Sequence, residues 1–433
     1  MRAVPFILLC LTAAALAAKP LATFTSKEWL GVDWPRTLVT YKVTFPARAA
    51  KAGMVRLVDA DGNGVPVQLS HVTEKGGYLA SARVSFFAEL KKNGSYSYTL
   101  VPGKPAPGAM MAVKTEPDGL LLTNEQVAIR VPAPGTKNLN PPKRMDAADD
   151  AFVPGALRGV RLLHGVWTAG AHFRAADPAT APKVTGYTCT PTVNGPLFTE
   201  VTTRYTFDNG GWYKCTVRLV AGDPNVYLDE QCDLKMIRAA RDWRMIYPLT
   251  DFDAAFKPDA AWWATSGGRL GGKDEAFEAA VTQAGFAPLP GNRGHLGSMT
   301  FQPPTEKKRL FEMAVWYPYA TTAYYAGFTE RAKLAGPKEQ IPFVGVMPMH
   351  AGNWRGMPES ANGEILTYPG GRLAVSWPLV VSPHPNSLLH TGEYDPALPY
   401  THIRRQWALM TGPMQYQQEM GAFRRYHGYI TLD

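Results

Sequence analysis

The chain has 433 residues and a formal net charge of +9, which is enough length for two or three domains with a sizeable core. Its 40 glycines, 37 prolines and 11% aromatic residues argue against a helical protein and are typical of short strands joined by many turns. The positive charge is scattered and no nucleic-acid-binding motif accompanies it, so we expect no nucleic-acid partner. That charge either forms an ordinary solvated surface or attracts an anionic polymer such as an acidic polysaccharide.

The first eighteen residues have the pattern of a cleavable export signal. Arg2 is basic, residues 4–11 are apolar, and Ala15-Leu16-Ala17 fits the small-x-small rule for cleavage. The apolar run is too short to span a bilayer as a helix. We therefore expect a signal peptide at 1–18 and a secreted or periplasmic protein with no membrane attachment after cleavage; a retained anchor is the alternative.

Residues 35–101 predict a small β-barrel domain. Its strands are expected at 38–45, 55–58, 65–69, 82–87 and 95–101. Asp59-Ala60-Asp61-Gly62-Asn63-Gly64 matches the first half of a calcium loop, but Ser70 stands where that loop needs a bidentate Glu. We predict a plain turn there and no cofactor, with a weak calcium site as the alternative.

Residues 102–108 are rich in Pro and Gly and indicate a linker at 102–118. A large antiparallel β super-sandwich is expected after it, at 119–400. Its clearest part is a meander of three strands at 199–207, 212–221 and 225–234. Helix-forming residues at 402–410 and 414–426 predict a short helical C-terminal tail at 401–433. We expect that tail to be the start of a helical domain that this chain lacks.

The turn around Asp223-Pro224 predicts a register for the last two meander strands. If Gly222 faces Asn225, Cys215 lies opposite Cys232 and Glu230 lies opposite Val217 on the apolar face. The two cysteines would form a cross-strand disulfide or remain buried thiols, and we favour thiols because directly opposed positions strain a disulfide. Glu230 is then either an edge residue that reaches solvent or a functional carboxylate.

Polar and aromatic residues of the kinds that bind sugars concentrate in the C-terminal third. Aromatic rings stack on the CH faces of sugars, and amides, imidazoles and guanidinium groups bond their hydroxyls. The candidate substrate-binding residues are Asn353, Trp354, His384, His390, His164 and Trp167. The same residues could instead pack loops as aromatics and core histidines, and a metal site from His350, His384 and His390 is a further alternative.

The order of elements resembles a known family of exported proteins. Trp29-Leu30-Gly31-Val32-Asp33-Trp34-Pro35 resembles the small N-terminal barrel of secreted exo-acting rhamnogalacturonan lyase-like proteins. Gly195-Pro196-Leu197-Phe198, with the meander that ends at Glu230, is similar to their central super-sandwich. Arg404-Arg405-Gln406-Trp407 and Tyr426-His427-Gly428 resemble the join to a following helical domain.

The resemblance implies a polysaccharide lyase, a carbon–oxygen lyase, or else a glycoside hydrolase that acts on a polysaccharide or oligosaccharide. This chain would be the N-terminal β part of that enzyme, either active on its own or inactive as a fragment. The alternatives are a noncatalytic carbohydrate-binding module and a structural scaffold for a missing catalytic domain.

A lyase site needs a group that offsets the uronate carboxylate and a base that takes the neighbouring proton. The residue types, rather than the family, suggest Arg355 and Asn353 for the first role and His350 or Tyr394 for the second. We therefore take His350, Arg355 and Tyr394 as the candidate catalytic residues.

Overall fold

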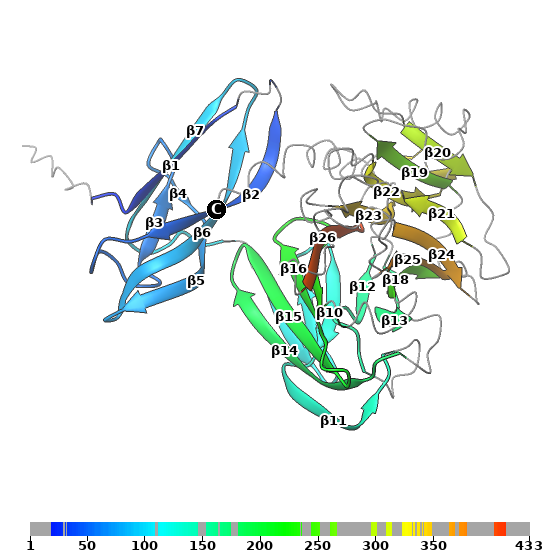
Figure 1. Cartoon of the computed structure of the whole chain (residues 1–433). Helices are drawn as coiled ribbons and strands as arrows, with labels where there is room; N and C mark the ends of the chain where they lie inside the picture. The colour runs from blue at the N-terminus through cyan, green and yellow to red at the C-terminus, as the bar shows by residue number, and fades with distance from the viewer. Residues whose placement is uncertain are drawn as a thin grey trace, which may run out of the picture. The chain divides into compact units, whose positions relative to one another are not determined.

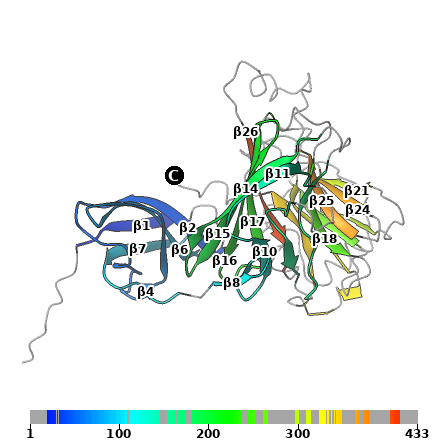
Figure 2. The same cartoon turned by 90° about the horizontal axis from the view of Figure 1, so that it is seen from below.

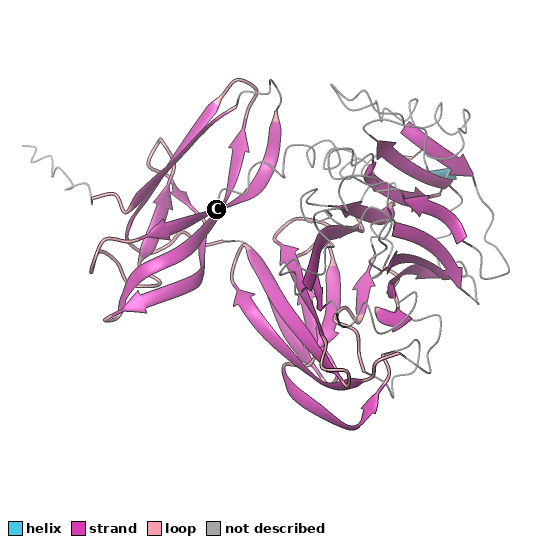
Figure 3. Cartoon of the chain, viewed as in Figure 1, coloured by secondary structure: helices cyan, strands magenta, loops and turns pink. Residues whose placement is uncertain are grey.

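The computed structural model describes residues 19–28, 31, 33–108, 111–145, 153–162, 165–174, 181–233, 235, 244–251, 260–265, 296–300, 309–313, 323–330, 332–333, 336–337, 340, 342–348, 363–368, 372–378 and 402–412. Strands dominate this part of the chain (Figure 3), which confirms the prediction of a mainly β protein. No helix within these ranges is long and apolar enough to cross a membrane. The chain forms two compact units that divide between residues 108 and 109.

The first unit is built from two antiparallel sheets. One has the strand order β1–β7–β3–β4 and the other has the order β2–β6–β5. Their bounds are β1 Ala22–Lys27, β2 Trp34–Thr44, β3 Val55–Val58, β4 Gly64–Val65, β5 Val67–Lys75, β6 Tyr78–Leu90 and β7 Ser95–Pro102. The strands expected from the sequence are therefore present, together with an additional first strand, β1.

The predicted barrel is wrong, because the two sheets of this unit face each other without closing. No described strand of one sheet pairs with a strand of the other. Each sheet buries one face in a shared core, to which β1 contributes Phe24, β6 contributes Phe86 and β7 contributes Leu100. The chain passes between the sheets at the β6–β7 turn, where Asn93 has a φ of 57°. Burial of one face of each sheet is the arrangement of a sandwich.

The turn at Asp59 is held by its own hydrogen bonds. Asp59 Oδ1 accepts the backbone N–H groups of Asp61 and Asn63 at 3.0 and 2.8 Å, and Oδ2 accepts Asn63 Nδ2 at 3.2 Å. These bonds lower the pKa of Asp59 against the opposing effect of desolvation. The carboxylate thus closes the β3–β4 turn, as the prediction of a plain turn requires.

Within its described residues, the second unit contains three antiparallel sheets; their strands are labelled in Figure 1. A four-stranded sheet has the order β12–β10–β9–β8, from β8 Ala112–Glu116, β9 Gly119–Thr123, β10 Ala128–Pro132 and β12 Gly159–Arg161. A five-stranded sheet has the order β13–β18–β25–β24–β21, from β13 His172–Arg174, β18 Arg244–Asp251, β21 Arg309–Met313, β24 Gly363–Tyr368 and β25 Arg372–Pro378. Strand β8 occupies part of the stretch expected to be a linker.

A ten-stranded sheet completes the unit and has the order β11–β14–β15–β16–β17–β26–β23–β22–β19–β20. The bounds are β11 Gly135–Lys143, β14 Val184–Asn194, β15 Phe198–Phe207, β16 Trp212–Val220, β17 Asn225–Asp233, β19 Ala260–Thr265, β20 Leu296–Thr300, β22 Ala323–Thr329, β23 Val344–Pro348 and β26 His402–Met410. The predicted three-strand meander corresponds to β15, β16 and β17.

The inner face of β14 to β17 packs against the other two sheets. Figures 1 and 2 both place β10 beside β15 and β16. Phe173 of β13 meets Tyr213 of β16 edge to face, with ring centroids 4.8 Å apart. The Asn124 side chain, after β9, donates to the carbonyls of Val220 and Asp223 at the β16–β17 turn. These contacts place the core between the long sheet and the shorter ones, as expected for a large antiparallel sandwich.

The register predicted for β16 and β17 is wrong by two residues. Cys215 lies opposite Glu230, while Cys232 lies opposite Tyr213 and Val217 lies opposite Leu228. A two-residue loop would place Pro224 inside the turn, where the favoured type I′ hairpin needs φ above zero and proline cannot supply it. The observed four-residue loop instead gives the positive φ of 73° to Gly222. A two-residue shift keeps each side chain on its predicted face, so the alternation of buried and exposed positions is confirmed.

The predicted helix at 402–410 is also wrong, because this segment is strand β26. It pairs with β17 along its whole length and with β23 at its end. Trp407, Ala408, Leu409 and Met410 are all fully buried, so both faces of the strand are covered. The helix preference of such residues amounts to at most about 0.7 kcal/mol each, and burial of a single large apolar side chain outweighs it. Residues 414–426 of the predicted tail lie outside the described residues.

The three cysteines of the second unit are buried thiols that form no disulfide, as predicted for Cys215 and Cys232. Burial raises the pKa of the Cys189 thiol, which keeps it protonated and a weak nucleophile. We predict that iodoacetamide leaves Cys189, Cys215 and Cys232 unmodified in the folded protein, and alkylates all three after unfolding without a reductant. Peptide mass spectrometry checks this. A pair that resists alkylation until a reductant is added would show a disulfide instead.

Candidate functional site

Of the nine residues predicted to form a site, only Trp167 belongs to the part of the chain that the structure describes. The others lie outside the described residues, so their grouping stays a prediction. They are His164, His350, Asn353, Trp354, Arg355, His384, His390 and Tyr394. The site is therefore built outward from Trp167.

Trp167 lies against the short sheet beside β12. It forms a bridge with Arg161, and its ring lies over Gly159, where an added Cβ would be only 3.4 Å from the indole. Gly159 pairs with Arg130 of β10, and the Arg130 guanidinium carbon lies 4.2 Å from the centre of the indole ring. Because glycine leaves this position of the sheet without a side chain, the indole occupies the space and contacts the neighbouring arginine.

Arg130 is held from two sides. Besides its contact with Trp167, its Nε donates to Glu116 Oε2 of β8 at 3.1 Å. The Arg130 side chain is 45% exposed and that of Glu116 is 26% exposed, so the ion pair contributes at most about 1 kcal/mol. Its main consequence is geometric, because stacking and one hydrogen bond together orient the planar guanidinium.

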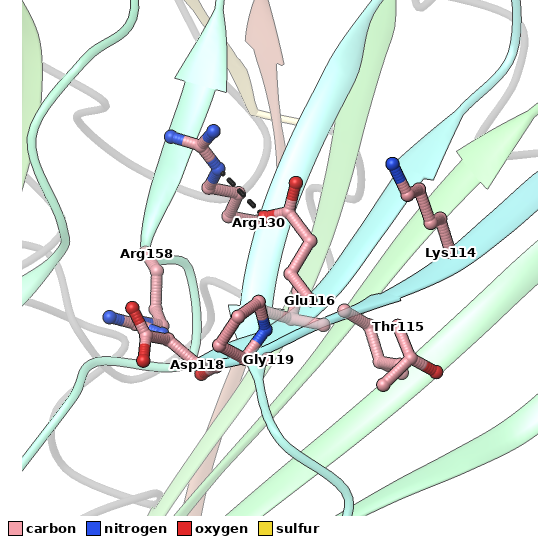
Figure 4. Close-up of a pocket in the computed structure, with 10 residues that line it drawn as sticks. Lys114, Thr115, Glu116, Asp118, Gly119, Arg130 and Arg158 are labelled. Carbon is pink, nitrogen blue, oxygen red and sulfur yellow. Dashed lines mark hydrogen bonds and ion pairs between the residues drawn. The ribbon is translucent and has the colours of Figure 1, made fainter.

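A cavity of about 500 Å³ opens beside this pair (Figure 4). Its charged lining residues are Lys114, Glu116, Asp118, Arg130 and Arg158. The β8–β9 turn forms one wall, and Gly119 lets it approach β10, since a Cβ there would lie 2.1 Å from the Val131 carbonyl oxygen. An N–H group of the Arg158 guanidinium donates to the Asp118 carbonyl.

The lining of this cavity suits an anionic, hydroxyl-rich ligand. Three cationic side chains and two carboxylates line one opening. Arginine forks match carboxylates in two-point contacts, while the acidic side chains accept hydrogen bonds from sugar hydroxyls. None of these residues was among the site residues predicted from the sequence. The Glu116-Pro117-Asp118-Gly119 turn was visible, but its approach to Arg130 and Arg158 depends on strand pairing.

No group of three or more His, Cys, Asp or Glu side chains that could hold a metal ion occurs among the residues with described placement. The histidines of the alternative metal site, His350, His384 and His390, lie outside those residues, so the alternative stays open. At the alternative calcium loop, both carboxylate oxygens of Asp59 accept hydrogen bonds from N–H groups of the same turn.

Glu230 is a buried carboxylate rather than an edge residue, since only 2% of it is exposed. Tyr213 Oη donates to its Oε1 at 2.5 Å, and Trp407 Nε1 donates to its Oε2 at 2.7 Å. The donors come from β16 and β26, the strands on either side of β17. Both carboxylate oxygens are therefore satisfied inside the core, which indicates a structural role for Glu230.

Comparison with known proteins gives no family for this chain. No protein-family model matches the sequence, and no curated protein matches it. Among solved structures, it is similar to a protein in glycosyl hydrolase family 38 from Enterococcus faecalis, with 10% identity, a TM-score of 0.46, and coverage of 92% of this chain and 46% of that one. An α-mannosidase from Enterococcus faecalis V583 gives 11% identity, a TM-score of 0.47, and coverage of 92% and 45%.

The chain thus spans about half the length of these two enzymes. Because both TM-scores are below 0.5, the similarity says nothing about the activity of this chain. Neither structure is a rhamnogalacturonan lyase, so that resemblance stays a prediction.

We predict that Glu230→Ala lowers the free energy of unfolding by about 2–5 kcal/mol, because it leaves two buried donors without their acceptor and opens a cavity. Glu230→Gln is the matched control. It keeps an acceptor for Trp407 and presents an amide to the Tyr213 hydroxyl, so its loss should be clearly smaller. Urea unfolding followed by tryptophan fluorescence compares the two variants. Equal losses would argue against hydrogen bonding as the role of Glu230.

Proposed function

We propose that this chain binds an acidic polysaccharide and forms the β part of a glycan-processing protein that works outside the cytoplasm. The observation that carries the proposal is the cavity at β8 to β10, where Lys114, Arg130 and Arg158 surround one opening. Guanidinium and ammonium groups recognise the carboxylates that distinguish acidic from neutral polysaccharides. The scattered positive charge of the chain supports the same class of partner.

The described residues of the cavity support binding more directly than catalysis. They provide three cations and two carboxylates. The half-buried indole of Trp167 lies beside them and contacts the Arg130 guanidinium. A binding module needs no positioned base, whereas a lyase needs one beside the proton that it removes. For the processing step we keep the candidates that the sequence suggests, His350, Arg355 and Tyr394.

We predict that Arg158→Gln and Arg130→Gln each weaken binding of polygalacturonate about tenfold, because a charge-assisted hydrogen bond contributes about 1.5 kcal/mol. Affinity electrophoresis at low ionic strength measures the effect. Lys75→Gln, at an exposed position of β5 in the first unit, is the control that changes net charge equally. No variant should differ from the wild-type protein in its binding of neutral galactan.

Two outcomes would count against the binding proposal. One is that the wild-type protein fails to bind polygalacturonate at all. The other is that Arg158→Gln, Arg130→Gln and Lys75→Gln all bind it equally, since net charge rather than the cavity would then explain the affinity. Added salt should weaken wild-type binding, because exposed charges are screened within about 10 Å at 0.1 M.

Catalysis is tested at His350. In an elimination, the base takes the proton next to the uronate carboxylate, the neighbouring carbon–oxygen bond breaks, and an unsaturated sugar end forms. We predict that the purified protein releases such ends from an acidic polysaccharide, and that His350→Ala reduces the rate at least about a hundredfold, the usual contribution of a general base. Ultraviolet absorbance of the unsaturated product is the measurement. An unchanged rate in His350→Ala would show that this residue is not the base.

A further inference from the structure

The outward face of β15 and β16 carries four directly opposed side-chain pairs. In order along the strands they are Glu200 with Arg218, Thr202 with Thr216, Arg204 with Lys214, and Thr206 with Trp212. The inward positions between them are buried. Of these eight side chains, Glu200 is buried, five are half-buried, and Arg204 and Thr206 are exposed. These pairs are therefore the surface that this part of the sheet presents outward.

Two of the pairs stabilise the sheet in the ordinary way. Arg218 Nε donates to Glu200 Oε1 at 2.6 Å, so opposite charges meet. The Thr202 and Thr216 hydroxyls hydrogen-bond at 2.8 Å. Each such cross-strand contact contributes a few tenths of a kcal/mol up to about 1 kcal/mol.

The third pair, Arg204 with Lys214, does the opposite. Like charges directly across a strand pair destabilise a sheet. The next residues along the same row are Thr188 of β14 and Gln231 of β17, and neither can neutralise the cations. The carboxylates diagonal to Lys214 have other donors: Asp229 accepts Gln406 Nε2 at 2.9 Å, and Asp233 accepts the Lys235 N–H at 2.7 Å.

Arg204 is nevertheless held in place. Its guanidinium carbon lies 5.2 Å from the centre of the Trp212 ring, within the range of a cation–π contact. The adjacent Thr202–Thr216 row presents two hydroxyls one step further along the strands. A guanidinium oriented by an indole, an ammonium beside it and a row of hydroxyls are the groups that would receive a carboxylate with its neighbouring sugar hydroxyls.

We propose that the Arg204–Lys214 pair is a second binding site, which receives a uronate carboxylate of an acidic polysaccharide. The occupant rests on the proposed function, but the site is separate from the cavity at β8 to β10. The bound carboxylate removes the repulsion between the two cations, so the pair costs stability in the free protein and contributes affinity in the complex. A local arrangement that conflicts with the stability of its own sheet is expected at functional positions.

The test is Lys214→Gln, with Lys75→Gln as the control for net charge. We expect Lys214→Gln to bind polygalacturonate about fivefold more weakly than wild type and to unfold at a higher temperature, because the variant loses both the ligand contact and the repulsion. Lys75→Gln should change neither quantity appreciably. Binding is measured by affinity electrophoresis at low ionic strength, and unfolding by differential scanning calorimetry without ligand.

The outcomes separate this inference from the proposed function. Wild-type binding that the cavity variants reduce and Lys214→Gln leaves unchanged would overturn the second site alone. A lower unfolding temperature for Lys214→Gln would also overturn it, because Lys214 would then be a stabilising residue. If the wild-type protein binds no polygalacturonate, the second site and the proposed function both fail.

Discussion

The pairing of β17 with β26 holds the second unit together, and it joins segments that are far apart in the chain. Glu230 and Trp407 are 177 residues apart, yet their side chains hydrogen-bond inside the core. Closing a loop of that length costs about 5 kcal/mol of chain entropy beyond a constant term. The nine paired positions of β26, with four consecutive residues buried on both faces, supply the compensating burial. Both the ten-stranded sheet and the enclosed core depend on this one ladder.

A buried carboxylate in that ladder is costly unless its partners are fixed. Tyr213 and Trp407 reach Glu230 from the two neighbouring strands, so the carboxylate is satisfied in only one relative position of β16, β17 and β26. A slip of β26 by one residue would turn Trp407 to the other face and leave Glu230 without that donor. The polar contact thus contributes specificity of register, while the surrounding aromatic side chains contribute most of the stability.

How far the sequence predicts this structure depends on the range of the interactions involved. The alternation along the strands of the meander is a local pattern, and it predicted correctly the meander and the alternation of buried and exposed positions in β16 and β17. The register of β16 and β17 depends on the turn, and the predicted two-residue turn does not allow for the restriction that Pro224 places on it. The β26 segment was predicted to be helical because its residues favour a helix locally, whereas the partner that makes it a strand lies far away in the chain. The cavity was missed for the same reason: Glu116, Arg130 and Arg158 meet only once β9 has paired with β8 and β10, and β10 with β12.

The separation between inward and outward positions explains how such a sheet can carry binding groups at all. In β15 and β16 the inward side chains, among them Tyr205 and Val217, are almost fully buried and provide the packing. Burial raises the pKa of Tyr205 well above its ordinary value, so this inward side chain stays uncharged. Because stability is supplied from that side, the outward face can tolerate an unfavourable pair such as Arg204 and Lys214, whose cost is small beside that of a core defect. The same division applies at β10, where Ile129 and Val131 are buried in the core and Arg130 between them faces the cavity. Cationic side chains on the outward positions of strands anchored by buried neighbours are therefore the feature that both candidate binding surfaces share.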